Sequence, residues 1–229
     1  MKGGEKMKRT KLSMRKLPEY SFGEEIMNMV THIVGGAFGM CVLTLCLIKA
    51  AKGGQGADIA GAIIYGVSMV ALYTVSSIYH GLRKGAGKKV LQVLDHCTIY
   101  ALIAGTYSII CLAAFLPAYP LIGWGLLSWE WALGALAITL TAIDLKKHTV
   151  FSMICYVGMG WSVICFVPHT IEVMTKAGFY LLLSGGIAYT IGAVLYGVGK
   201  KKRWIHSVFH IFVVLGSVLQ FLSIYFYAL

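Results

Sequence analysis

The sequence predicts an all-α integral membrane protein, a bundle of seven transmembrane helices with its amino terminus in the cytoplasm and its carboxyl terminus outside. Three observations lead to this fold class. Apolar residues make up 58% of the 229-residue chain and charged residues only 13%, whereas about a quarter of a soluble domain is charged. The apolar residues form long uninterrupted runs. The lysines and arginines lie in short clusters between those runs.

A helix that crosses a bilayer needs about 20 mostly apolar residues, and seven stretches of the chain meet this requirement. Glu130 interrupts the fourth stretch, and the fifth is short. Residues 1–20 are expected to form a basic cytoplasmic segment, and residues 21–229 a seven-helix membrane domain. No apolar run of a cleaved signal peptide precedes the first span, so that span is expected to anchor the protein. The expected spans are Thr31–Ala50, Ile59–His80, His96–Ala118, Leu121–Ile143, Val150–Val167, Ala177–Val198 and His206–Ala228.

Charge asymmetry between the loops predicts the orientation. The amino-terminal segment and the loops after spans two, four and six together carry 17 lysines and arginines, and the opposite set of loops carries 3. Cytoplasmic loops of membrane proteins are enriched in these residues. Within the first span, Gly35 and Gly39 form a Gly-x-x-x-Gly pair, which predicts close packing against another helix.

Composition also excludes several classes of protein. The net charge of +11 is confined to clusters and does not follow an aromatic-bearing face, so nucleic acid is not an expected partner. Apolar content is too high for intrinsic disorder. Six cysteines, all within apolar runs, do not form a disulfide scaffold. The expected partner is membrane lipid, and no soluble partner is predicted.

Ionisable residues inside membrane spans are costly, so they mark candidate functional sites. His80 ends span two, Asp95 lies beside the start of span three, and His206 and His210 open span seven. With the predicted orientation, all four fall in one cytoplasmic layer. Ser76 lies one helical turn deeper than His80 on the same face.

The three histidines predict a metal site with zinc as its cofactor. His206 and His210 are spaced i, i+4, which puts both rings on one helix face about 6 Å apart along the axis. His80 supplies a third imidazole, and three nitrogen ligands with an open fourth position are the pattern of a catalytic zinc site. The alternative is that these histidines are packing or interface residues held by hydrogen bonds.

Asp95 and Ser76 are the candidate catalytic residues, and each has a structural alternative. Asp95 can be an N-cap of its helix, where a carboxylate favours the helix dipole. Ser76 can bond to a ligand or water, or only to a backbone carbonyl of its own helix. His96 is expected to face away from the site. Glu130 is expected to lie toward the outer side, where it snorkels, bonds across the bundle or lines a permeation path.

Several short motifs carry a family resemblance. They lie around the first, second, third and seventh spans, and only as a set are they specific. The motifs are Glu24-Glu25-x-x-Asn28-x-x-x-His32, Ser76-x-x-x-His80, Leu94-Asp95-His96 followed by Tyr100 and Ala104-Gly105-Thr106-Tyr107, and His206-x-x-x-His210.

Together these motifs resemble the hemolysin III family, bacterial relatives of the progestin and adipoQ receptors in a superfamily that includes the alkaline ceramidases. The resemblance covers residues 21–229. It implies seven helices, a location in the bacterial plasma membrane and a zinc ion held by His80, His206 and His210. It further implies that Asp95 holds a water at the zinc and that Ser76 supports the site. The Glu25, Asn28 and His32 motif is expected to be a structural cap over the cytoplasmic mouth.

Three functions remain open from the sequence. The first is a zinc-dependent hydrolase that acts on a lipid amide or ester in membrane lipid or fluidity homeostasis, with Asp95 as the base because it is the only carboxylate expected at that depth. The second is a pore-forming hemolysin or channel. The third is a receptor-like sensor with a structural zinc.

Overall fold

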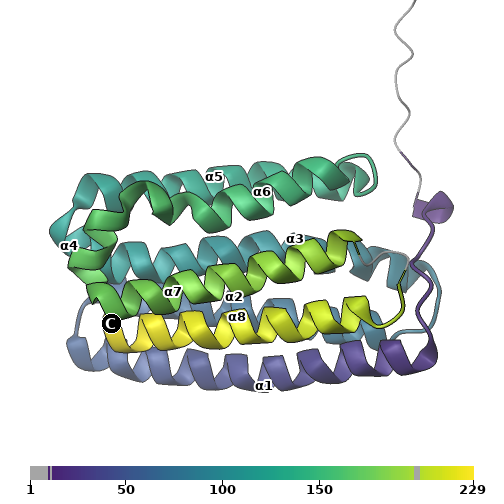
Figure 1. The fold of residues 1–229 in the computed structure, drawn as a ribbon, viewed down its shortest axis with the longest axis horizontal. Helices are drawn as coiled ribbons and strands as arrows, with labels where there is room; N and C mark the ends of the chain where they lie inside the picture. Colours follow the sequence, from purple (N-terminus) through teal and green to yellow (C-terminus); the bar gives the residue numbers. More distant parts are fainter. Residues whose placement is uncertain (1–9, 11, 199–201) are drawn as a thin grey trace, which may run out of the picture.

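The computed structural model describes residues 10, 12–198 and 202–229, and every regular element in these ranges is helical. Most of the expected basic segment, residues 1–9 and 11, lies outside the described residues. Figure 1 shows long helices lying side by side along the longest axis of the molecule. In chain order the elements are η1 (Leu12–Met14), α1 (Phe22–Gly53), α2 (Gly56–Gly81), α3 (Ala86–Ile109), η2 (Ile110–Phe115), α4 (Leu116–Ala118), α5 (Pro120–Asp144), α6 (Thr149–Trp161), η3 (Ser162–Phe166), α7 (Val167–Val198) and α8 (Ile205–Tyr227).

The described chain contains six helical stretches that are long and apolar enough to cross a membrane. The sequence predicted seven spans, and the difference lies in one stretch of 49 residues, Thr149–Gly197, which covers the expected fifth and sixth spans. This stretch is not one regular helix. It includes the 3₁₀ segment η3, and Thr175 within α7 has a non-helical backbone with φ 64°. An all-helical membrane fold is therefore confirmed.

The helices begin earlier than the hydropathy pattern indicates, and local capping explains the first case. Ser21 is the N-cap of α1, and its side chain and Glu24 bond to each other's backbone in a capping box. The motif from Glu24 to His32 is consequently part of α1 and does not precede it. Helix α3 likewise begins at Ala86, so Asp95 lies well inside the helix and the N-cap alternative for Asp95 is wrong.

Small residues allow α1 and α2 to pack closely. A Cβ added at Gly35 would lie 2.5 Å from the Tyr73 ring, and one added at Gly39 would lie 3.3 Å from Met69. The predicted role of this glycine pair in helix packing is confirmed. On the other side of the same contact, a Cβ added at Gly66 would lie 2.7 Å from the Cα of Leu43. These close contacts hold α1 against α2, and the ends of the two helices are held together with them.

Candidate metal centre

Three histidines from two distant helices meet where α2 ends and α8 begins. His80 is on the last turn of α2, and His206 and His210 are on the first two turns of α8. One ligand nitrogen from each residue lies within 4.8 Å of the others. His80 and His210 are buried, and His206 is partly buried. The sequence prediction that these three side chains converge is confirmed.

The nitrogen atoms of this cluster could hold a metal ion, and all three lie within 4.8 Å of one another. His206 Nε2 and His210 Nε2 are 3.1 Å apart, and two nitrogens bound to one tetrahedral zinc lie about 3.3 Å apart. His80 Nε2 and His210 Nδ1 are buried and lack a hydrogen-bond partner among the described residues. Buried polar atoms are usually paired, so the unpartnered His80 Nε2 agrees with a ligand at this position. A single N–H shared between His206 and His210 is the alternative account of their short contact.

Glu25 orients the first of these histidines. His80 Nδ1 lies 2.7 Å from Glu25 Oε2, the distance of a hydrogen bond that an imidazole donates to a carboxylate. The other oxygen of Glu25 accepts a hydrogen bond of 2.6 Å from the buried Lys88 ammonium group. A carboxylate on one ring nitrogen fixes the tautomer and leaves the opposite nitrogen for a metal. Glu25 therefore holds His80 with Nε2 as its available ligand atom.

Asn28 and His32 continue the same face of α1 behind the cluster. The side-chain amide oxygen of Asn28 accepts a hydrogen bond of 2.7 Å from the hydroxyl of Ser207, which follows His206. The His32 ring stacks on His210 with ring centroids 3.8 Å apart. The expectation of a cap over the cytoplasmic mouth is too limited, since these residues contact the metal-site histidines and their helix directly. The i, i+4 spacing of Asn28 and His32 was the available signal for a shared face.

Tyr20 is a site residue that the sequence reasoning missed. Its ring stacks on His206 at a centroid distance of 4.8 Å and lies 5.8 Å from that of His80. Burial raises the pKa of Tyr20 well above its ordinary value, so its hydroxyl group is protonated at neutral pH. No local pattern distinguishes this tyrosine from others, because it precedes α1 and reaches the site only through the folded chain.

The candidate catalytic residues line an apolar cavity that ends at the histidines. Asp95, Ser76, His206 and His210 all form part of its wall. Asp95 is partly buried, with a side chain 16% exposed, and Ser76 is buried. The cavity is lined by residues of α1, α2, α3, α6, α7 and α8, and its volume is about 160 Å³.

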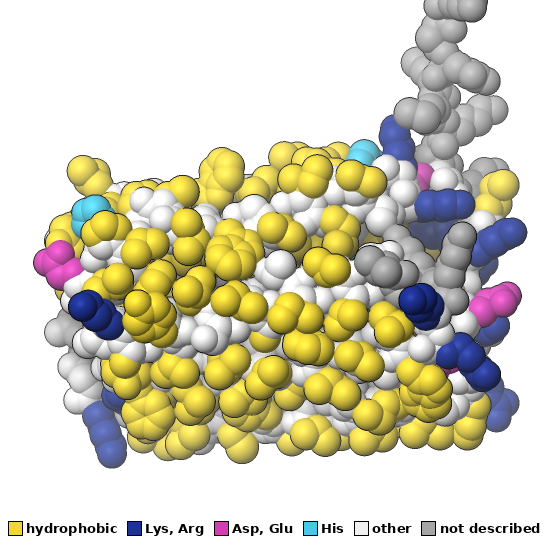
Figure 2. Space-filling view, viewed as in Figure 1, with side chains coloured by type: hydrophobic (Ala, Val, Ile, Leu, Met, Phe, Trp, Pro, Cys, Tyr) yellow, Lys and Arg dark blue, Asp and Glu magenta, His cyan; other side chains and the backbone are white. Residues whose placement is uncertain are grey.

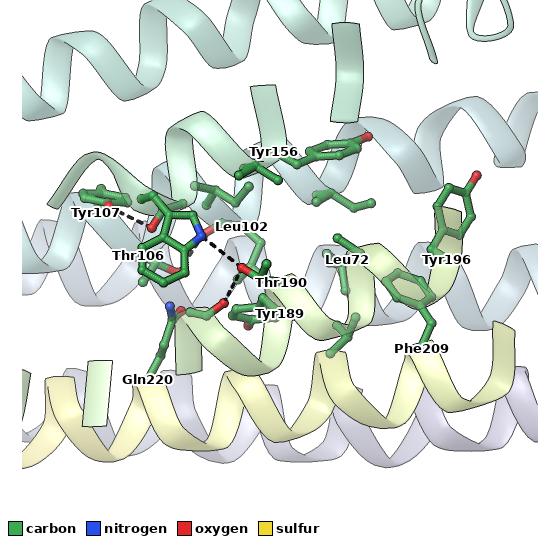
Figure 3. A pocket seen from close by; sticks show the side chains of 18 of the residues that line it. Leu72, Leu102, Thr106, Tyr107, Tyr156, Tyr189, Thr190, Tyr196, Phe209 and Gln220 are labelled. Atoms are coloured by element: carbon green, nitrogen blue, oxygen red, sulfur yellow. Dashed lines mark hydrogen bonds between the residues drawn. The ribbon is translucent and has the colours of Figure 1, made fainter. Parts of the chain in front are cut away.

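The cavity extends from the histidines far into the bundle. Along α3 and into the start of η2 its lining runs from Asp95 to Ile110, which corresponds to about 22 Å at the rise of an α-helix. Figure 3 shows the rings of Tyr107 and Tyr196 toward its two ends. Asp95 is the only carboxylate or formally charged side chain among its described lining residues.

Two other ionisable residues lie apart from the metal ligands. His96 bonds to the backbone of Gln92 and to the Tyr196 hydroxyl, but it also lines the same cavity as Asp95, with its Nδ1 4.0 Å from Asp95 Oδ2, so the expectation that it faces away from the site is wrong. Glu130 is fully buried and accepts a hydrogen bond from Ser162, while its second oxygen has no partner among the described residues. It does not line the cavity that ends at the histidines.

The fold and this site define a multi-pass helical membrane protein with a buried three-histidine candidate metal centre at one end of the bundle. Comparison with known proteins identifies the family to which the chain belongs. The haemolysin-III related family matches residues 20–221, and the chain belongs to this family. The predicted family is thus confirmed, and the match supports the predicted location, a multi-pass protein of the bacterial plasma membrane.

Individual relatives agree with the family assignment. The chain is 36% identical to Hemolysin-3 of Bacillus cereus over 206 residues, which covers 90% of this chain and 92% of the relative. It is 35% identical to the Hemolysin-3 homolog of Bacillus subtilis (strain 168), over 91% of this chain and 96% of the relative. A more distant relative is the human monocyte to macrophage differentiation factor, 25% identical over 72% of this chain and 69% of the relative.

Proposed function

We propose that this protein is a zinc-dependent hydrolase that cleaves a lipid amide or ester within the membrane. The observation that carries the proposal is the convergence of three imidazoles at the end of an apolar cavity whose wall also holds Asp95 and Ser76. Three neutral nitrogen ligands beside a carboxylate are a donor set that suits zinc. A role in membrane lipid or fluidity homeostasis follows from such an activity.

The proposed reaction gives a separate role to each residue of the site. His80, His206 and His210 hold the metal, which when bound polarises a carbonyl and acidifies water. Asp95 accepts the proton of the attacking water, as the carboxylate that lines the same cavity as His206 and His210. Ser76 lies in the cavity wall and donates a hydrogen bond to the bound ligand or to water. Glu25 acts through His80 and is a positioning residue.

The surroundings of the cavity favour a substrate that arrives from the lipid. The cavity wall includes Val157 of α6 and Ile164 of η3, and both residues are about 40% exposed. Lining residues that also face the bilayer support lateral access between these segments and α7. An acyl chain in the apolar cavity would bring its polar end to the histidines.

The alternatives are a pore or a receptor-like sensor with a structural metal. The name of the Bacillus cereus relative, Hemolysin-3, favours a lytic activity for that protein. Against a pore in this chain, the cavity described here is lined mostly by apolar side chains and carries one carboxylate. A sensor shares the same metal site and differs only in lacking turnover.

We further propose that the chain crosses the membrane seven times, with the amino terminus in the cytoplasm. A single crossing needs about 20 residues, and the stretch Thr149–Gly197 has 49. Figure 1 draws α6 beside α5, and α7 returning beside α8. Two crossings within this stretch agree with the charge distribution, because they keep the basic loops on one side.

The test is a paired measurement of metal content and hydrolysis on purified protein. We expect about one zinc per chain by mass spectrometry, loss of most of it in His206→Ala, and retention in His148→Ala, whose residue lies in the turn after α5. Fatty acid should be released from a lipid amide only by zinc-loaded protein. Zinc without turnover on any lipid amide or ester would favour the sensor, and ion conductance in liposomes without turnover would favour the pore.

A further inference from the structure

A second cavity lies at the end of the bundle where α1 and α8 begin. The segment before α1, the turn after α5 and the residues before α8 enclose a volume of about 820 Å³, which we call the cationic vestibule. Figure 2 shows lysine and arginine side chains gathered at this end of the molecule. The wall carries five cationic side chains and two carboxylates, which are Arg15, Lys16, Lys146, Lys202 and Arg203, with Glu19 and Glu24.

The two carboxylates, together with Asp144 near Arg15, leave an excess of positive charge around the vestibule. Glu24 already accepts hydrogen bonds from the backbone N–H groups of Ser21 and Trp204, at 2.8 and 2.7 Å. Glu19 is exposed to solvent. A cavity with an excess of cationic side chains attracts anions and raises their local concentration.

The loop that bears two of the cations is held in a specific conformation. Trp204 has φ 66°, a left-handed value that is costly for a residue with a side chain. Its backbone N–H donates to Glu24, and its ring fits against Gly23, where an added Cβ would lie 3.3 Å away. Residues 202 and 203 are thereby tied to the start of α1, across 180 positions of sequence.

The vestibule and the apolar cavity are neighbours at the metal site. His206 and Tyr196 belong to the walls of both cavities. One side of this wall is cationic, and the other is apolar and extends along the bundle. A ligand that fills both spaces must have an anionic end and an apolar end, with its central bonds at the histidines.

Membrane topology alone does not explain Arg15. Cytoplasmic loops are enriched in lysine and arginine, and exposed residues such as Lys84 are accounted for by this rule. Arg15 is different, because its Nε is buried and lacks a hydrogen-bond partner among the described residues, while its Nη2 donates to the Ile143 carbonyl. Asp144 lies near Arg15 but is outside the vestibule wall. A buried donor without a partner, in the wall of a cavity, indicates a ligand.

We propose that the ligand of this site is an amphiphile whose anionic headgroup occupies the cationic vestibule and whose acyl chain occupies the apolar cavity. The shared chemistry of the headgroup is a carboxylate or phosphate one or two bonds beyond the amide or ester. This inference rests on the proposed function for the cleavage of that bond. The binding itself does not need turnover.

The experiment compares two amphiphiles that differ only at the head. N-lauroylglycine is anionic, and N-lauroylethanolamine has the same chain and amide with a neutral hydroxyl group. Binding to the full-length protein in neutral detergent is measured by calorimetry, with and without zinc, so that direct coordination of the carboxylate is separated from the vestibule. We expect N-lauroylglycine to bind about tenfold more tightly without zinc, equivalent to about 1.4 kcal/mol.

Matched variants locate this preference. Arg203→Gln and Arg15→Gln should each reduce the preference, and together they should reduce it further, since three of the five cations remain. Lys84→Gln removes the same charge from the exposed loop between α2 and α3, outside the vestibule, and should leave the preference unchanged. Arg203 is exposed, so its variant remains informative if Arg15→Gln fails to fold. Equal binding of the two amphiphiles, or an undiminished preference in the double variant, would overturn the proposal.

Two further arms separate an amphiphile site from simpler explanations. N-acetylglycine and inorganic phosphate carry the anion without the chain, and at millimolar concentration they should not displace N-lauroylglycine. Displacement by either one would mean a site for free anions and would overturn the amphiphile. Hydrolysis of both amides at equal rates would overturn the headgroup preference but leave the hydrolase standing. A binding preference without hydrolysis would leave the headgroup inference standing and count against the hydrolase.

Discussion

Glu25 and His80 are joined by a contact of 2.7 Å between Oε2 and Nδ1, and this contact links the first turn of α1 to the last turn of α2. It connects the buried Lys88 ammonium group to a metal-site imidazole through a single carboxylate. The tautomer of His80, and with it the nitrogen offered to a metal, is therefore set by a residue on a different helix.

Glu25→Gln should weaken zinc binding about 10–100-fold, because the amide keeps the shape of the carboxylate but loses its charge. Affinity is measured by competition with a chromophoric chelator. Glu19→Gln is the control, since Glu19 is an exposed carboxylate that does not contact the histidines. Unchanged affinity in Glu25→Gln would show that His80 does not depend on this contact.

Asp95→Asn should keep most of the zinc and reduce any hydrolytic rate by roughly 10²–10⁴, the typical contribution of general-base catalysis. The amide is nearly isosteric with the carboxylate but does not accept the proton at neutral pH. His148→Ala, in the turn after α5 and outside the cavity wall, should retain both zinc and activity. A wild-type rate in zinc-loaded Asp95→Asn would mean that Asp95 is not the base.

Gly66→Ala should lower the stability of the fold by about 1–3 kcal/mol, the usual cost of an overpacked contact. The added Cβ would lie 2.7 Å from the Leu43 Cα, so the backbone of α1 would have to move. Gly158→Ala in α6 is the matched control, because nothing lies within 4 Å of its added Cβ. Thermal unfolding in detergent compares the two, and equal midpoints would contradict the close approach of α1 and α2.

A reporter that is active only in the cytoplasm should be silent when it is fused after Leu229 and active when it is fused within the loop between α2 and α3. The expectation follows from an odd number of crossings and a cytoplasmic amino terminus. A reporter that is active outside provides the reciprocal measurement on the same fusions. Cytoplasmic activity after Leu229 would refute the seven-span topology.

The fold class could be predicted from the sequence because hydropathy is a local property. Each apolar run is long enough to satisfy its own backbone hydrogen bonds as a helix, which a bilayer requires. The boundaries were less predictable. The start of α1 depends on the capping box at Ser21 and Glu24, and the 3₁₀ segment η3 and the break at Thr175 divide a stretch that remains apolar throughout. Hydropathy does not register either effect.

By itself, the sequence determined that this is a helical membrane protein and that His80, His206 and His210 share one end of the bundle, because helix length and i, i+4 spacing fix depth and face. Tertiary structure alone decided that Glu25 orients His80, that His32 stacks on His210 and that Tyr20 covers His206. It also decided that a cationic and an apolar cavity are neighbours at His206. These contacts join residues separated by 55 to about 190 positions, and they depend on how each helix is rotated against its neighbours. That rotation is set by packing across the whole bundle, for which no local pattern exists.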